Sequence, residues 1–171
     1  MMGFASLYPS YAGLQKMKNI LSILSGFLGP FGFRKSGKDL LFTSDDVAIV
    51  LNAQKSNYSN EYYLNVGVWI HCIGGVNDKP KENICHIRIR ADNFLLERCE
   101  QFDFSAIFGK YQVDEIDDVN VIDRFLIQCL VPLLEKLKSL GEIKNMYLQG
   151  DFDGVLINKD ARSFFMNWQQ A

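Results

Sequence analysis

The stretch VAIVLNAQKSNYSNEYYLNVGVWIHC, residues 47–72, contains two runs of alternating apolar and polar residues around a short polar segment. Apolar residues occupy every second position of each run: Val47, Ile49, Leu51, Leu64, Val66, Val68 and Ile70. Alternation with a period of two is typical of strands that bury one face, because successive side chains point to opposite sides of a sheet. The stretch therefore predicts strands over residues 47–56 and 61–73, joined by the loop NYSN.

A third run of the same kind follows the polar connection GGVNDKPKEN. ICHIRIRA, residues 84–91, places apolar side chains at every second position and His86, Arg88 and Arg90 between them. A shorter apolar run at residues 39–43 comes after a turn at Ser36-Gly37 and before the first long strand. Successive strands with short polar connections are typical of an antiparallel meander, here of about four to six strands.

Helical periodicity lies on both sides of these strands. Apolar residues at three- and four-residue steps predict helices over residues 14–28, 122–140 and 160–169. Gly29-Pro30 ends the first of these and Gly141 the second, within which Pro132 indicates a kink or a division into two helices. Residues 93–118 favour neither a helix nor a strand throughout, although the acidic DEIDD suits a helix start.

Strands in succession, flanked by helices and without β-α-β alternation, indicate the α+β class. We expect an antiparallel β-sheet with helices packed on one face. The chain of 171 residues is long enough for one substantial core and contains no linker, so a single domain over residues 1–171 is expected. Residues 1–12 are a candidate disordered N-terminal extension.

Composition narrows the class of protein. Apolar residues make up 48% of the chain, and the formal net charge is −2 at pH 7. Because binding to a phosphate backbone depends on clustered Lys and Arg, nucleic acid is not the expected partner. The apolar segment at residues 17–33 is broken by glycines and has no small-residue cleavage site. We therefore expect neither a signal peptide nor a membrane span, and a cytoplasmic location.

The cysteines are widely spaced, at Cys72, Cys85, Cys99 and Cys129. Zinc sites need closely spaced pairs of ligands, and none occurs here. The nearest candidate joins the doublets His71-Cys72 and Cys85-His86, but adjacent residues of a strand point to opposite faces. We therefore expect no metal, and buried free thiols in a reducing compartment.

The standard catalytic motifs are absent from the sequence. It contains no phosphate-binding glycine loop, no dinucleotide fingerprint, no Ser nucleophile elbow and no zinc-binding His pair on a helix. This absence argues against an enzyme, and no cofactor is expected.

A polar strip remains on the face opposite the apolar one. If the strands pair in sequence, one side of the sheet carries Asn52, Gln54, Ser56, Asn65, His71, His86, Arg88 and Arg90. Tyr63 and Trp69 share that face, where they favour an interface or a covering segment of the same chain. Lys55 is out of step, because alternation places it on the packed side unless a bulge redirects it.

The strip has a structural and a functional interpretation. Cross-strand polar pairs on a solvated face stabilise a sheet by about 0.2–1 kcal/mol each, and the strip is accounted for by such pairs. Alternatively, arginine forks suit carboxylate or phosphate recognition, and a histidine suits proton transfer near neutral pH.

The four segments LGPFGFRKSGKDLLF, VAIVLNAQKSNYSNEYYLNVGVWI, CHIRIRAD and CLVPLLEKL together resemble the bacterial domain-of-unknown-function family 4304, over about residues 14–140. The motif positions of that family correspond here to Gly32, Phe33, Gly37, Gln54, Lys55, Ser56, Asn65, Gly67, His86, Arg88 and Arg90. Members often carry Glu between the two arginines, where this chain has Ile89. The resemblance implies a bacterial cytoplasmic protein and supplies no substrate, but several of its motif residues fall on the polar strip.

The preferred functional hypothesis is non-catalytic recognition of a protein partner or a small anionic ligand on the polar face. Its candidate residues are Asn52, Gln54, Lys55, Ser56, Asn65, His71, His86, Arg88 and Arg90. The alternative is a hydrolase acting on a phosphoester-like substrate, with His86 as acid or base and Arg88 and Arg90 holding charge. Self-association into a homo-oligomer is a third hypothesis.

Overall fold

The computed structural model describes residues 20–58, 62–96, 98–100, 102 and 119–168. The candidate extension at residues 1–12, the first turns of the helix predicted from residue 14, and the acidic DEIDD segment lie outside these residues.

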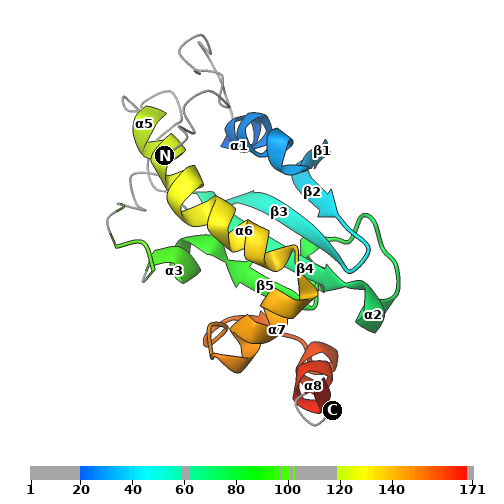
Figure 1. Cartoon of the computed structure of the whole chain (residues 1–171). Coiled ribbons are helices and arrows are strands. Elements are labelled where there is room, and N and C mark those ends of the chain that lie inside the picture. The colour runs from blue at the N-terminus through cyan, green and yellow to red at the C-terminus, as the bar shows by residue number, and fades with distance from the viewer. Residues whose placement is uncertain (1–19, 59–61, 97, 101, 103–118, 169–171) are drawn as a thin grey trace, which may run out of the picture.

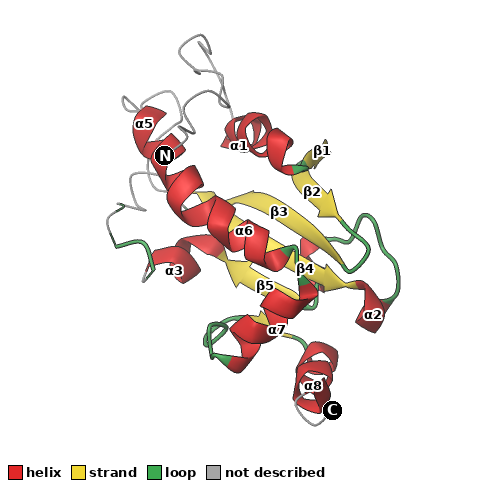
Figure 2. Cartoon of the chain, in the orientation of Figure 1, coloured by secondary structure: helices red, strands yellow, loops and turns green. Residues whose placement is uncertain are grey.

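Six strands form one antiparallel sheet in the order in which they occur in the chain (Figures 1 and 2). They are β1 (Arg34–Ser36), β2 (Asp39–Thr43), β3 (Val47–Lys55), β4 (Tyr62–Ile70), β5 (Ile87–Arg90) and β6 (Leu156–Ile157). The register of β3 and β4 runs without interruption from the pair Val47 and Ile70 to the pair Lys55 and Tyr62. The predicted antiparallel meander and the α+β class are confirmed.

The helical elements surround this sheet. They are α1 (Ile20–Leu28), η3 (Gly29–Phe31), α2 (His71–Gly74), η4 (Glu82–Ile84), α3 (Ala91–Leu96), α5 (Val119–Phe125), η6 (Leu126–Leu130), α6 (Val131–Leu137), α7 (Leu140–Leu148) and α8 (Lys159–Trp168). Figure 1 shows the long segment from α5 to α6 lying across the sheet, with α1 beside the β1–β2 end and α7 and α8 beyond β5.

The core lies between these helices and the first face of the sheet, the face of Val47, Ile49 and Leu51. The largest fully buried side chains come from both layers: Leu24, Leu28, Leu40, Ile49, Leu51, Leu64, Ile70, Ile87, Ile89, Phe125, Leu126 and Phe165. Most of the strand residues in this set are those that the alternation places on the packed side. Burial of this apolar surface is the main stabilising contribution to such a fold.

Two of the predicted strands are shorter than expected. The fourth strand ends at Ile70: the backbone N–H of His71 still donates to the carbonyl of Asp46, and the chain then enters the single turn α2. The fifth starts at Ile87, after η4, and Ala91 already belongs to α3. His71 is therefore not a strand residue, and the prediction that it extends the strip as part of a strand was wrong.

The helix predicted over residues 122–140 is divided. Leu126–Leu130 is a π-helical turn in which the N–H of Val131 donates to the carbonyl of Leu126. Pro132 has no N–H to donate and its ring crowds the preceding turn, and a wider turn relieves both problems. The helix restarts at Leu140 after Ser139, whose side chain accepts from the N–H of Glu142. Gly141 therefore lies inside α7 and is not the predicted stop.

The cysteines depart from the predicted free buried thiols at three positions. Cys99 and Cys129 form a disulfide, which joins the segment after α3 to the π-helical turn. Cys72 is free but exposed, and only Cys85 is both free and buried. Cys99 and Cys129 lie close together because α3 and η6 pack against each other. Their wide spacing in the sequence gave no indication of this proximity.

Candidate functional site

The second face of the sheet, the side of Ala48, Val50 and Asn52, is not uniformly open. The connection at residues 75–86 folds back over its middle, and Ala48 and Val50 are fully buried. A Cβ atom on Gly67 would lie 2.7 Å from the Sγ of Cys85 and 3.2 Å from the Cα of Glu82. Glycine at position 67 therefore lets η4 approach the sheet, and the face is divided into a covered middle and two ends.

Arg88 lies under this connection. Its Nε donates to Oε1 of Glu82 at 2.9 Å, and the Glu82 side chain is only 15% exposed. The arginine thus holds η4 against β5 through a charge-assisted hydrogen bond. The structure gives Arg88 an internal partner in the folded chain.

His86 is buried with 3% of its surface exposed, under the same cover. Its ring packs on Trp69 with 4.2 Å between the ring centroids, and its Nδ1 accepts a hydrogen bond of 2.8 Å from the N–H of Ile70. Burial lowers the pKa of His86, although the negative charge of Asp160 acts in the opposite direction. A neutral, enclosed imidazole whose Nδ1 is already an acceptor is poorly placed for acid–base chemistry.

One end of the second face carries the amide part of the strip. Asp39, Asn52, Asn65 and Arg90 lie directly opposite one another on four neighbouring strands. These side chains and their neighbours satisfy each other: Asn52 donates to Asp39, and Asn65 donates to Gln54 at 3.1 Å. The guanidinium of Arg90 lies 3.6 Å from the centroid of the Tyr63 ring, and its Nε lies 3.6 Å from Oδ2 of Asp92. This end, the amide end, is a cross-strand network of Asp39, Asn52, Gln54, Asn65 and Arg90.

Lys55 and Ser56 stand at the end of β3. Because the register continues unbroken to the pair Lys55 and Tyr62, no bulge shifts the backbone of Lys55 out of the alternation. The Ser56 hydroxyl accepts from the N–H of Tyr58 at 3.1 Å and so shapes the turn that follows the strand.

His71 lies at the other end of the second face. It is 8% exposed, and its Nδ1 lies 3.0 Å from the backbone carbonyl oxygen of Asp45. Its Nε2 is buried and has no hydrogen-bond partner in the described part of the chain. A buried polar atom without a partner costs free energy, so its surroundings need an explanation.

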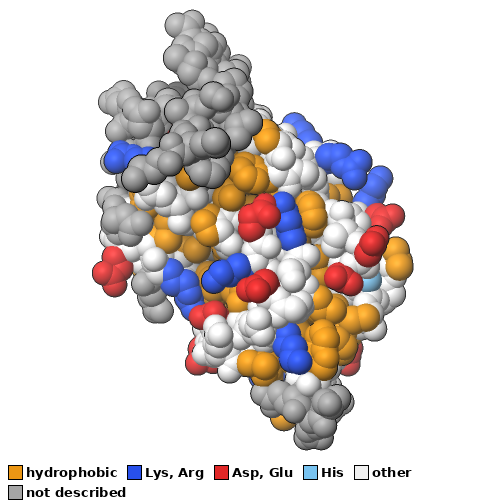
Figure 3. Space-filling view, in the orientation of Figure 1, with side chains coloured by type: hydrophobic (Ala, Val, Ile, Leu, Met, Phe, Trp, Pro, Cys, Tyr) orange, Lys and Arg blue, Asp and Glu red, His pale blue; other side chains and the backbone are white. Residues whose placement is uncertain are grey.

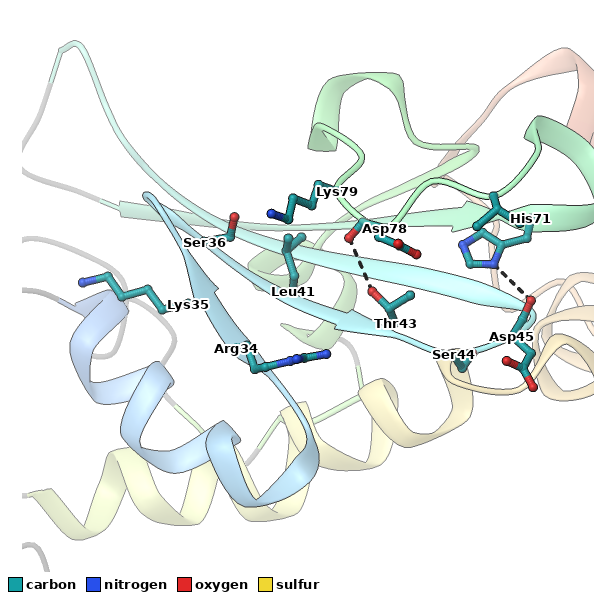
Figure 4. Close-up of a pocket in the computed structure, with 11 residues that line it drawn as sticks. Arg34, Lys35, Ser36, Leu41, Thr43, Ser44, Asp45, His71, Asp78 and Lys79 are labelled. Carbon is teal, nitrogen blue, oxygen red and sulfur yellow. Dashed lines mark hydrogen bonds between the residues drawn. The ribbon is translucent and has the colours of Figure 1, made fainter.

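A groove of about 720 Å³ opens beside His71, between the β1–β2 hairpin and the start of the connection (Figure 4). Its lining comprises Arg34, Lys35, Ser36, Leu41, Thr43, Ser44, Asp45, His71, Val76, Asp78 and Lys79. The hydroxyl of Thr43 donates to the carbonyl of Asp78 at 3.4 Å and so ties the connection to β2 across the groove.

Charge is distributed unequally along this groove. Arg34, Lys35 and Lys79 contribute basic groups, and none of the three belongs to an ion pair among the described residues. Figure 4 shows Asp45 and His71 at the end near α2, Asp78 between Lys79 and His71, and Lys35 at the opposite end. Figure 3 shows Lys and Arg atoms over the β1–β2 edge, and acidic and His atoms beside α2. The groove is basic on the hairpin side and acidic on the α2 side.

Among the sequence candidates whose side chains the structure describes, Ser36 not being one of them, only His71 lines the groove; Asn52, Gln54, Asn65 and Arg90 lie at the opposite end. Sequence reasoning missed Arg34, Lys35 and Lys79. The visible signal was the basic character of FRKSGK and NDKPK. These segments come together only because β1 forms and the connection folds back over the sheet, and neither event has a periodic pattern.

Neither a metal centre nor a reactive thiol emerges at this face. The described residues contain no group of three or more His, Cys, Asp or Glu side chains placed to hold a metal ion. Burial and the neighbouring Glu82 raise the pKa of Cys85 to about 12, so this thiol is not an activated nucleophile.

The sequence model of the family described as domain of unknown function (DUF4304) matches residues 24–135, which is more than half of the chain. The chain belongs to the DUF4304 family. Comparison with curated proteins and with solved structures found no match. The DUF4304 match includes β1 to β5, and hence the groove and the amide end of the second face. In the described residues of this DUF4304 protein, no helix is long and apolar enough to cross a membrane.

Proposed function

We propose that this DUF4304 protein is a non-catalytic binding module that takes up a small anionic ligand in the groove beside His71. One observation carries the proposal: three basic side chains, Arg34, Lys35 and Lys79, line one groove without an acidic partner in the described structure. Arg88 and Arg90, in contrast, are engaged by Glu82 and by Tyr63 with Asp92.

The groove has the size and the chemistry for such a ligand. Its volume of about 720 Å³ lies within the range of small-molecule sites. A guanidinium presents a planar fork that matches carboxylate or phosphate, and two ammonium groups add mobile positive charge. Because these side chains are exposed, the attraction is screened by salt, and we expect binding to weaken as ionic strength rises.

The hydrolase alternative has less support. It requires His86 to exchange a proton with a substrate, but His86 is buried against Trp69 and accepts from the backbone of β4. It also requires Arg88 to hold substrate charge, and Arg88 is committed to Glu82. Recognition by the amide end has less support too, because its side chains already pair with one another.

The test is a titration of ¹⁵N-labelled protein with inorganic phosphate and with succinate, followed by amide chemical shifts. We expect the shifts to concentrate at residues 34–36, 43–45 and 76–79. Arg34→Ala and Lys79→Ala should each weaken binding about threefold to tenfold, as expected for loss of one partly exposed charged contact. Lys38→Ala is the matched control, because Lys38 is exposed in the same hairpin and does not line the groove.

The titration distinguishes binding in the groove from binding at the amide end. Shifts that cluster around Asn65 and Arg90 would move the binding site to the amide end and refute the groove. Equal affinities of Arg34→Ala, Lys79→Ala and Lys38→Ala would also refute it, since only two of these residues line the groove. Absence of saturable shifts with both probes would remove anion binding altogether.

A further inference from the structure

We infer that the ligand of this groove is a small zwitterion, whose anionic group lies on the basic hairpin side and whose ammonium group is received by His71 and Asp78. The inference rests on the proposed function and specifies the class of ligand. It is carried by a different observation, the buried and unpartnered Nε2 of His71.

The hydrogen bond at the other ring nitrogen fixes what Nε2 can do. A backbone carbonyl oxygen only accepts, so the contact of 3.0 Å between Nδ1 of His71 and the oxygen of Asp45 requires the proton on Nδ1. In the neutral ring, Nε2 then carries a lone pair and is an acceptor. For the neutral ring, the group that completes this site is therefore a hydrogen-bond donor, and a fully deprotonated anion does not provide one.

The charges around His71 select the kind of donor. Asp45 and Asp78 line the same end of the groove, and neither belongs to an ion pair among the described residues. Figure 4 shows the Asp78 carboxylate on the side of the His71 ring that faces away from Asp45. An ammonium group that displaces the cover of Nε2 there meets both a carboxylate and a ring lone pair, whereas a second anionic group would be repelled.

The two ends of the groove therefore favour groups of opposite charge on the same ligand. Arg34 and Lys79 attract the anionic group, and the Asp78 and His71 end receives the ammonium group. The hydrogen bond from the Thr43 hydroxyl to the Asp78 carbonyl links this part of the groove to β2. The distance between the basic side of the groove and its Asp78 and His71 end determines how long a ligand must be to contact both.

The experiment compares three matched series of probes: alkyl phosphates, ω-hydroxyalkyl phosphates and ω-aminoalkyl phosphates, each with chains of two to six carbons. Dissociation constants come from the same amide titrations. At one chain length or more, we expect the aminoalkyl phosphate to bind about tenfold more tightly than the alkyl phosphate, as expected for one charge-assisted contact. The hydroxyalkyl phosphate should fall between them.

Two variants test whether His71 and Asp78 cause the preference for the aminoalkyl phosphate. His71→Asn keeps a donor for the Asp45 carbonyl and removes the atom corresponding to Nε2, and Asp78→Asn removes the carboxylate. In each we expect the ratio of the two dissociation constants to fall towards one, and in Lys38→Ala to remain about tenfold. The protein has only two histidines, so the ¹⁵N resonance of His71 Nε2 can be followed directly, and it should shift only with the amino and hydroxy series.

The three possible outcomes bear differently on the zwitterion inference and on the proposed anion site. Equal binding of alkyl and aminoalkyl phosphates at every length overturns the zwitterion inference and leaves the proposed anion site standing. An amino preference that survives both His71→Asn and Asp78→Asn overturns the assignment to these residues. Absence of binding by all three series overturns the inference and the proposed function together.

Discussion

At position 86 a histidine is enclosed as a neutral acceptor between strands. Its Nδ1 receives the N–H of Ile70, and its backbone carbonyl receives the N–H of Asn158, so it links β4 to the segment that starts α8. Trp69 covers one side of the ring, and the Trp69 indole donates to the carbonyl of Gly75 at 2.8 Å. This residue is therefore a structural part of the covered middle of the second face.

The pH dependence of stability follows from this burial. Because the pKa of His86 is lower in the folded chain than its ordinary value of 6.5, the unfolded chain binds the proton more readily. The contribution of His86 to stability is complete above about pH 6.5 and is lost as the pH falls from there through the folded-state pKa. His86→Asn can still accept from Ile70 and does not titrate, so its stability should fall less steeply. Urea unfolding between pH 7.5 and 5 measures both curves, and parallel curves would contradict the expectation.

Gly67 is the second residue on which the covered middle depends. Alanine there would place a methyl group against Cys85 and the backbone of Glu82, so η4 must move away from the sheet. We expect Gly67→Ala to lower the free energy of unfolding by about 1–3 kcal/mol. Gly29→Ala is the matched control, because nothing lies within 4 Å of its added Cβ, and it should change stability by less than about 0.5 kcal/mol. Equal effects of both substitutions would show that the close contact at Gly67 carries no cost.

At the scale of elements, alternation and helical periodicity were sufficient where the elements are long. β3 and β4 have nine residues each, and their apolar positions identified one side of the core. β1 and β6 have three and two residues, too few for a period to be recognised. The π-helical turn η6 accommodates Pro132. From the sequence, Pro132 indicated only that the helix must bend or divide.

The disulfide between Cys99 and Cys129 joins the segment after α3 to η6, and no local pattern could indicate that these lie close together. It predicts a definite count of reactive thiols. Alkylation of the native protein should modify Cys72 alone, because Cys85 is buried and its pKa is about 12. Unfolding without a reductant should expose two thiols in all, and unfolding with a reductant all four. Intact mass measures each count, and four thiols without reduction would contradict the disulfide.

The same disulfide should stabilise the fold. It closes a loop with a sequence separation of 30, for which chain entropy gives about 3–4 kcal/mol. Urea unfolding with and without a reductant measures the loss. Cys72→Ala is the control, because Cys72 forms no disulfide, and its stability should respond to the reductant as the parent protein does. An unchanged midpoint on reduction would contradict the expected contribution.

For the whole molecule, the second face is divided into a covered middle, an amide end and a groove. Strand parity correctly grouped Asn52, Asn65 and Arg90 on one side of the sheet. It could not indicate which part of that side the chain itself covers, because the connection at residues 75–86 consists of turn-forming and charged residues without a period. The groove exists only because this connection returns over the sheet, and so its basic residues were not recognised.

This division assigns different roles to the two arginines of HIRIR. Arg88 holds η4 through Glu82, whereas Arg90 rests on Tyr63 at the amide end. We expect Arg88→Ala to speed amide hydrogen exchange at Ile84, Cys85 and His86, whose N–H groups bond within the connection or to β4. Arg90→Ala should leave exchange at those amides unchanged.

Native-state exchange followed by NMR compares the two variants, and Glu82→Gln supplies the third measurement. Because this substitution keeps a hydrogen-bond acceptor for Arg88 but removes the negative charge, its exchange rates should lie between those of the parent protein and Arg88→Ala. Equal exchange in Arg88→Ala and Arg90→Ala would show that the ion pair does not hold the connection. In that case Arg88 would again be a candidate for ligand contact, and the separation of the face into three parts would have to be abandoned.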